Sequence, residues 1–212
     1  MRKIQLWLEF TSFFIALPFV LFLYRVQLKR MVIPVLFVGL IVFLIILIRD
    51  KTFNRKTLWL SDGFWCHMKP VLLRFVLGGA GLFLLVYLLE PTLLFNFVKG
   101  EPKIWLIVMC LYPLVSVYPQ EIIYRAFFFH RYKPLFPNPY IMILASGLTF
   151  GLVHIFFFNW WALTLSTVGG IMFAWTFHRS RSILFTSIEH GLWGDLIFTV
   201  GLGLYFYSGA IS

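Results

Sequence analysis

Ionisable side chains interrupt apolar sequence in three short stretches, at residues 120–125, 150–154 and 189–195. A charge at the centre of a membrane helix costs about 2.5–3.5 kcal/mol on insertion scales, so each of these residues is a candidate for function. Glu121 and Arg125 are four positions apart and share a helix face, where a structural ion pair is the simplest alternative. A packed core residue is the simplest alternative for His154.

One carboxylate and two imidazoles on three separate helices can meet at one point. Glu121, His154 and His190 suit a zinc ion with an open position for water, and they equally suit a glutamate base with histidine partners. Either arrangement can activate water for peptide hydrolysis if a donor stabilises the developing oxyanion. We therefore expect these three residues to form a catalytic group, and the same three to be the ligands if a divalent metal, zinc first, is the cofactor.

The composition indicates a membrane protein. Of 212 residues, 61% are hydrophobic and 12% are charged, whereas a soluble domain has about 45–50% apolar and about 25% charged residues. The net charge of +10 would suggest nucleic acid for a soluble protein. In a membrane protein, basic loops instead set the orientation and contact anionic lipid. We expect membrane lipids, and no nucleic acid, as partners.

Apolar runs long enough to span a bilayer need about 20 residues. Seven candidates lie at approximately residues 6–24, 31–48, 71–89, 104–118 and onward, 140–158, 161–177 and 183–207. They predict an all-α, polytopic bundle of about seven or eight transmembrane helices. Pro119 lacks a backbone donor, so we expect a new half-helix to begin there. Arg74 and Glu90 lie near the ends of their span, from which long side chains can reach the interface.

The order of the three polar stretches resembles the CPBP (CAAX prenyl protease and bacteriocin-processing, or Abi) family of intramembrane proteases. That family shows Glu-Glu-x-x-x-Arg, then Phe-x-x-x-His, then His-x-x-x-Asn or Asp. Phe150 and His154 match the middle motif, Glu121 and Arg125 match the end of the first, and His190 begins the last. The resemblance covers roughly residues 118–207. Two positions depart from it, because Gln120 replaces the first glutamate and Gly194 replaces the final Asn or Asp, with Asp195 one residue later.

The resemblance implies an intramembrane endopeptidase acting on membrane-associated peptides or protein tails. Glu121 would activate water, and His154 and His190 would bind metal or hold the oxyanion. Arg125 would orient Glu121, and Asp195 would be a lesser partner. The chain is expected to be one integral membrane domain, residues 1–212, with its catalytic core at about 104–207. We expect a multi-pass protein of a bacterial inner (cytoplasmic) membrane.

Three further residues are candidates for contacts to a substrate or partner: Gln120, Phe150 and Glu189. Two other function classes remain open. Gln120 and Gly194 favour a non-catalytic relative that binds a partner, as an immunity or protein-sorting accessory protein. A small transporter or ion-binding protein would use the same buried groups, although the sequence has no inverted repeat. Cleavage of a peptide in detergent separates the protease from both.

Overall fold

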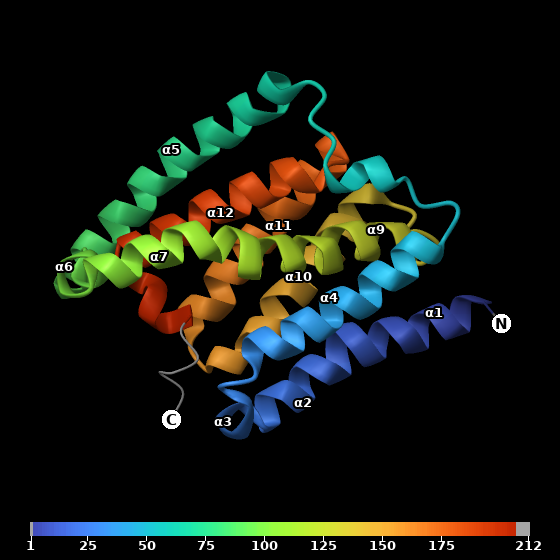
Figure 1. The fold of residues 1–212 in the computed structure, drawn as a ribbon, viewed down its shortest axis with the longest axis horizontal. Coiled ribbons are helices and arrows are strands. Elements are labelled where there is room, and N and C mark those ends of the chain that lie inside the picture. The colour runs from blue at the N-terminus through green and yellow to red at the C-terminus, as the bar shows by residue number, and fades with distance from the viewer. Residues whose placement is uncertain (1, 207–212) are drawn as a thin grey trace.

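A computed structural model describes residues 2–206, which form a helical bundle (Figure 1). The predicted all-α membrane bundle is confirmed. The α-helices are α1 (Arg2–Thr11), α2 (Leu17–Leu23), α3 (Arg25–Leu28), α4 (Val32–Arg49), α5 (Phe64–Leu89), α6 (Asn96–Gly100), α7 (Pro102–Tyr112), α8 (Tyr118–Glu121), α9 (Phe128–Arg131), α10 (Pro139–Val153), α11 (Trp160–Ser180) and α12 (Ile183–Thr199). Shorter 3-10 turns cover Arg55–Leu58, Pro91–Leu93, His154–Phe157 and Leu202–Phe206.

Five helical stretches within the described residues are long and apolar enough to cross a membrane by length and composition. They are Lys3–Leu23, Val32–Arg49, Phe64–Leu89, Pro102–Arg131 and Pro139–Phe157. The last two expected spans, α11 and α12, do not reach the same standard. Helix α12 has only 17 residues and ends at Thr199, well before the expected limit at Tyr207, which lies outside the described residues. The chain is an integral, multi-pass membrane protein.

The fourth span is one continuous helical path that passes through two π-helical turns. These turns are Pro113–Val117 and Ile122–Phe127, on either side of α8. A proline removes a helix hydrogen bond, and a π turn absorbs the disturbance without ending the helix. The prediction that a new half-helix begins at Pro119 is therefore wrong. The two π turns bracket Glu121, and such turns are frequent at functional sites.

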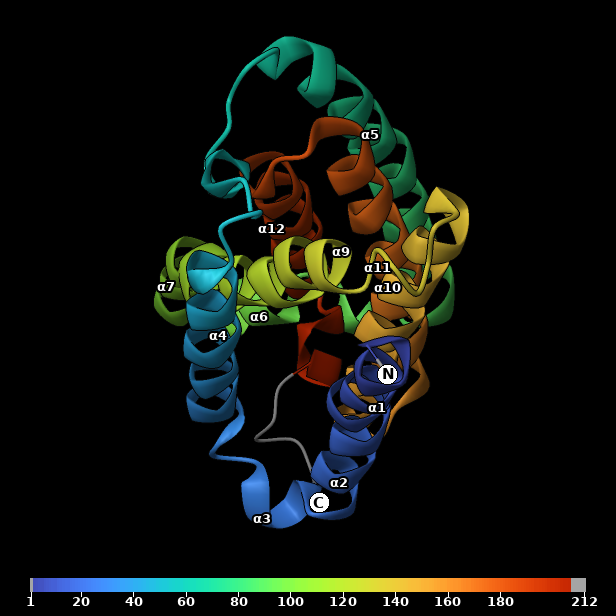
Figure 2. The same cartoon turned by 90° about the vertical axis from the view of Figure 1, so that its right-hand side faces the viewer.

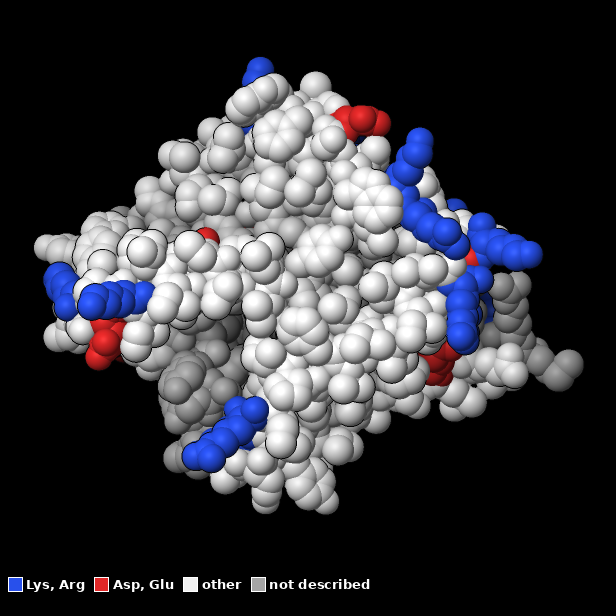
Figure 3. All heavy atoms as spheres, viewed as in Figure 1, with Lys and Arg blue, Asp and Glu red and all other residues white. Residues whose placement is uncertain are grey.

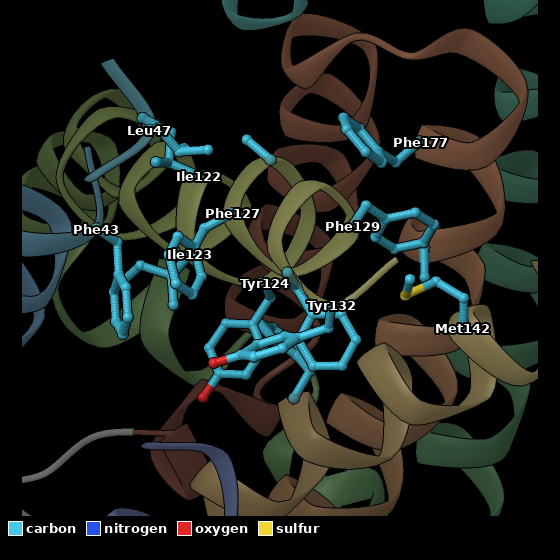
Figure 4. Close-up of a cluster of buried hydrophobic side chains, with 14 of the residues drawn as sticks. Phe43, Leu47, Ile122, Ile123, Tyr124, Phe127, Phe129, Tyr132, Met142 and Phe177 are labelled. Atoms are coloured by element: carbon cyan, nitrogen blue, oxygen red, sulfur yellow. The ribbon is translucent and has the colours of Figure 1, made fainter. Parts of the chain in front are cut away.

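A dense aromatic core holds this path in place. Figure 4 shows Phe43 and Leu47 of α4 packed towards Ile122, Ile123 and Phe127 of the second π turn. The Phe43 and Phe127 ring centroids are 4.3 Å apart. Phe127 is fully buried, and burying such a side chain stabilises the fold by about 1.5–3 kcal/mol. The helix that carries Glu121 is thus fixed against α4.

Small residues let α10 and α11 approach closely. A Cβ atom on Gly170 would lie 2.9 Å from the backbone oxygen of Gly147, and one on Gly147 would lie 2.7 Å from the backbone nitrogen of Ile171. Close backbone approach through small residues is typical of membrane helix pairs, because van der Waals packing drives their association. This contact brings Phe150 of α10 and the carbonyl of Gly170 to the same place in the bundle interior.

Charged groups gather at the ends of the molecule and leave a broad face of other residues between them (Figure 3). At the end where α9 stops, Arg131 donates two hydrogen bonds to Glu9 of α1, from Nε to Oε1 at 2.9 Å and from Nη2 to Oε2 at 2.6 Å. Nearby, His130 lies 2.9 Å from Asp50. Hydrogen bonds from Thr52, and then that from His130, hold the pKa of Asp50 well below its ordinary value. These contacts fasten α1, α4 and α9 together at one end.

Helices α4 and α5 stand apart from each other in both views of the ribbon (Figures 1 and 2). Helix α5 packs mainly on α12, while α4 packs on the second π turn and α8. Residues of both helices line one cavity, whose wall also includes Gln120, His154 and His190.

Candidate active site

The centre of the polar group is a carboxylate–imidazole contact between α8 and α12. Oε1 of Glu121 lies 2.8 Å from Nδ1 of His190, and Glu121 is fully buried. An ionised carboxylate only accepts hydrogen bonds, so Nδ1 of His190 carries the proton and donates it. The lone pair of this imidazole is then on Nε2. His190 is also clamped between rings, stacked on Phe173 at 4.5 Å and edge-on to Phe150 at 5.4 Å.

Arg125 holds the other side of the same carboxylate. Its Nε is 3.2 Å from Oε2 of Glu121, and both side chains are fully buried. Its Nη2 donates to the carbonyl of Gly170 at 3.0 Å, and its guanidinium lies over the Phe150 ring, 4.5 Å from the centroid. Burying an ion pair is a weak source of stability, because desolvation cancels much of the attraction. A chain of contacts from the fully buried Arg125 and Glu121 to the nearly buried His190 therefore points to a site.

His154 joins the group from the end of α10. Its Nδ1 lies 2.7 Å from the carbonyl oxygen of Phe150, so Nδ1 donates and Nε2 keeps the lone pair. The Phe150 ring lies 4.8 Å from the His154 ring and 5.4 Å from the His190 ring. The two histidines thus share one aromatic neighbour, and the three motifs come together.

A cavity of about 1120 Å³ adjoins this group. Most of its wall is apolar, and α4, α5, α7, α11 and α12 together supply more than half of the lining residues. Among the described residues, the wall includes Gln120, His154 and His190 but neither Glu121 nor Arg125. Volumes of about 300–1,000 Å³ are usual for small-molecule sites, so this cavity has room for a long apolar ligand or an extended peptide segment.

Gln120 and Glu121 have different surroundings. Gln120 lies in the cavity wall, and its amide Nε2 donates to Ser116 Oγ at 2.7 Å. Glu121 faces His190 and Arg125 behind that wall. The sequence predicts that Glu121 activates water itself, but the buried carboxylate meets the cavity only through His190. This geometry favours a holding role for Glu121.

A zinc ion does not fit this arrangement. In residues 2–206, no group of three or more His, Cys, Asp or Glu is placed to hold a metal ion. Both nitrogens of His190 have protein partners, Glu121 at 2.8 Å and the Tyr112 hydroxyl at 3.3 Å. Even if Tyr112 gives up its long contact, the two Nε2 atoms of His190 and His154 supply only two ligands, whereas catalytic zinc usually has three protein ligands. No step through a metal is derived from this site.

Two residues expected at the site lie beside it. Glu189 is fully buried but turns to Arg74 of α5, whose Nη2 is 2.7 Å from Oε1 of Glu189 and 2.8 Å from Thr176 Oγ1. Arg74 was expected to reach the interface and instead lines the cavity. Asp195 is not in the described cavity wall, because α12 stays a regular helix through Gly191 and Gly194 and turns it away from His190.

Tyr112 is a site residue that the sequence motifs missed. It ends α7, lines the cavity, and places its hydroxyl 3.3 Å from Nε2 of His190. The ring fits only because residue 194 is glycine: a Cβ there would lie 2.5 Å from the hydroxyl oxygen and 2.6 Å from Cζ. The signal in the sequence was Gly194 itself, since a missing side chain beside His190 leaves room for another.

Comparison with known proteins supports the motif assignment. Residues 102–194 match the family model described as Rce1-like, type II CAAX prenyl endopeptidase. A search of curated proteins and a search of solved structures gave no match. The matched segment runs from the first residue of α7 to Gly194 and contains Tyr112, Glu121, His154 and His190. The resemblance to the CAAX prenyl protease and bacteriocin-processing family is therefore confirmed over residues 102–194.

Proposed function

We propose that this protein is an intramembrane endopeptidase in which Nε2 of His190 activates water while Glu121 holds the imidazole. The observation that carries the proposal is the 2.8 Å contact between Oε1 of Glu121 and Nδ1 of His190. A buried carboxylate in this position fixes the tautomer of histidine and stabilises the imidazolium that forms when Nε2 takes a proton. Arg125 holds the other carboxylate oxygen of Glu121 in place, with its Nε 3.2 Å from Oε2.

The groups that touch the water and the peptide all lie at the cavity wall, with Glu121 behind His190. As the water oxygen attacks the carbonyl carbon, its proton passes to Nε2 of His190, and the C=O π electrons move to the oxygen. When the tetrahedral intermediate collapses, the C–N bond breaks and the proton on Nε2 passes to the leaving nitrogen. His154 and Gln120, in the same wall, would orient the peptide and the water.

The cavity and the family name together suggest the substrate class. The matched family is named for CAAX prenyl endopeptidases, and the apolar wall of this cavity suits a hydrophobic chain beside the polar group. We infer that substrates are membrane-associated peptides or protein tails carrying such a chain. We also propose that the protein lies in a bacterial inner membrane. The proposed mechanism does not require a divalent metal.

The test is cleavage of a synthetic peptide with a prenylated cysteine near its C-terminus, by pure protein in detergent. We expect cleavage by the wild type and a loss of kcat of about 10⁴-fold in Glu121→Gln, the size seen when such a carboxylate is neutralised. Glu9→Gln is the matched control, because it also breaks a glutamate–arginine pair, away from the site. Unchanged activity in Glu121→Gln would remove the role given to this pair.

Glu121→Gln also weakens the ion pair with Arg125, so it needs a companion variant. His190→Gln leaves the Arg125–Glu121 pair in place and removes the base. Melting temperatures of both variants in the same detergent show whether a loss of activity comes from unfolding. The proposal expects both variants to be inactive while His190→Gln keeps a melting temperature close to that of the wild type.

The second candidate is a non-catalytic relative that binds a partner peptide. The observation that favours it is Gln120 in the cavity wall, because an amide cannot take up a proton. A non-catalytic relative would bind the prenylated peptide without cleaving it. A wild type that is inactive, folded and able to bind the peptide would support this candidate over the protease.

A further inference from the structure

We propose that Tyr112 is a catalytic residue, whose hydroxyl donates a hydrogen bond to the oxyanion that forms from the scissile carbonyl. The inference rests on the proposed peptidase function of the same site and adds a donor that the motifs do not contain. It concerns a residue of α7, outside all three polar stretches.

The position of the hydroxyl is the first argument. Nε2 of His190 carries the lone pair, and the Tyr112 hydroxyl lies 3.3 Å from it, at the long end of the hydrogen-bond range. In the resting state the phenol therefore donates weakly to the base. Water that gives its proton to Nε2 must approach the same nitrogen, so the attacked carbonyl lies next to this hydroxyl.

Protonation of the base frees the donor. Once Nε2 has taken the proton from water, it no longer has a lone pair to accept from Tyr112. The phenolic O–H can then turn towards the carbonyl oxygen, which gains negative charge in the same step. The hydrogen bond is thus stronger in the transition state than in the ground state, which is the condition for lowering the barrier.

Among the described residues of the cavity wall, Tyr112 is the donor that contacts Nε2 of His190. The Arg74 guanidinium, which also lines the cavity, is engaged by Glu189 and Thr176. The Gln120 amide donates to Ser116. Arg125 lies behind the described cavity wall.

Gly194 makes this placement possible and is the second argument. A Cβ atom on residue 194 would lie 2.5 Å from the hydroxyl oxygen of Tyr112. The α-helix therefore has a glycine at this position, although alanine would stabilise a helix by about 1 kcal/mol more. That cost is explained if the phenol is needed at Nε2. Gly194 and Tyr112 therefore depend on each other, because the glycine leaves the space that the phenol fills.

The experiment compares Tyr112→Phe with Tyr132→Phe on the prenylated peptide, measuring kcat, KM and melting temperature. Tyr132 is buried outside the described cavity wall, and its hydroxyl donates to Oε1 of Glu9 at 3.2 Å, so the control removes a hydrogen-bonded phenol hydroxyl away from the site. We expect Tyr112→Phe to lower kcat by about 10²–10³-fold, the usual effect of losing one oxyanion donor, with KM and melting temperature unchanged. Tyr132→Phe should keep the wild-type kcat.

A second measurement decides the inference independently of turnover. The probe is a phosphinic analogue of the same peptide, which presents a tetrahedral, negatively charged oxygen, compared with the uncleavable N-methyl amide peptide. The wild type should bind the phosphinic peptide more tightly, and Tyr112→Phe should lose at least about tenfold of that preference while its affinity for the amide peptide stays the same.

The outcomes separate the two claims. If the wild type cleaves and Tyr112→Phe cleaves equally well, the inference about Tyr112 is wrong and the proposed function stands. An inactive wild type overturns the proposed function, and equal phosphinic binding by the wild type and Tyr112→Phe then overturns the inference as well. If Tyr112→Phe raises KM and leaves kcat unchanged, Tyr112 is a substrate-binding residue. That result would contradict its role as oxyanion donor.

Discussion

Glu121 and His190, 69 positions apart in the chain, meet through a 2.8 Å contact between Oε1 and Nδ1. Arg125 closes the other side of the carboxylate at 3.2 Å, and Tyr112 covers the free nitrogen of the imidazole at 3.3 Å. The result is a chain of four polar side chains that leads from the buried interior to the wall of a large apolar cavity. The buried ion pair thus lies next to the imidazole that we propose takes the proton from water.

Gly194→Ala tests the fit between α12 and Tyr112. The added Cβ would overlap the phenol, so we expect a loss of about 1–3 kcal/mol in the free energy of unfolding, the usual cost of overpacking. With Tyr112→Ala already present, Gly194→Ala should cost almost nothing, because the space is empty. Urea unfolding in detergent of the two single variants and the double variant measures this coupling, and additive effects would contradict the contact.

Arg74 and Glu189 form a separate pair, and its energetics can be predicted. Arg74→Met leaves Glu189 buried without its partner, and removing one member of a buried pair costs about 3–5 kcal/mol. Arg74 is one-third exposed, so the lower end of this range is expected. The double variant Arg74→Met/Glu189→Leu should recover most of the loss. Melting temperatures of the three variants are the measurement, and a double variant as unstable as Arg74→Met would disprove the pairing account.

Zinc content tests the metal alternative that the sequence left open. With both nitrogens of His190 engaged by Glu121 and Tyr112, we expect pure protein washed with a chelator to keep its melting temperature and its peptide cleavage. Elemental analysis of the wild type and His154→Ala should then give the same substoichiometric metal. One zinc per chain in the wild type, lost in His154→Ala, would restore a metal centre at this site.

The sequence predicted which polar residues lie together better than it predicted the path of the chain. Polar residues in apolar helices cost so much that their positions marked Glu121, His154 and His190 directly. Which of Gln120 and Glu121 faces the cavity could not be predicted. Adjacent helix residues differ by about 100° in direction, and the π turns on either side of α8 change the directions that a regular helix would give.

Tyr112 and Arg74 show why the remainder escaped prediction. A tyrosine at the end of an apolar run has the pattern of an interface residue, whereas its contact with α12 across Gly194 places its hydroxyl beside His190. Arg74 was assigned to the interface by its position in the span, but its partner Glu189 lies 115 positions later. Pairings at such separation depend on helix packing, which spacing along one helix does not encode.

The measurement that tests the central claim most directly is cleavage of the prenylated peptide by the wild type and by Gln120→Glu, side by side in detergent. If the Glu121–His190 pair activates water, the wild type cleaves with Gln120 in place, and Gln120→Glu changes kcat by less than about tenfold, which is about 1.4 kcal/mol in activation free energy. An inactive wild type that gains cleavage through Gln120→Glu would show instead that the catalytic carboxylate belongs at position 120, and would contradict the account.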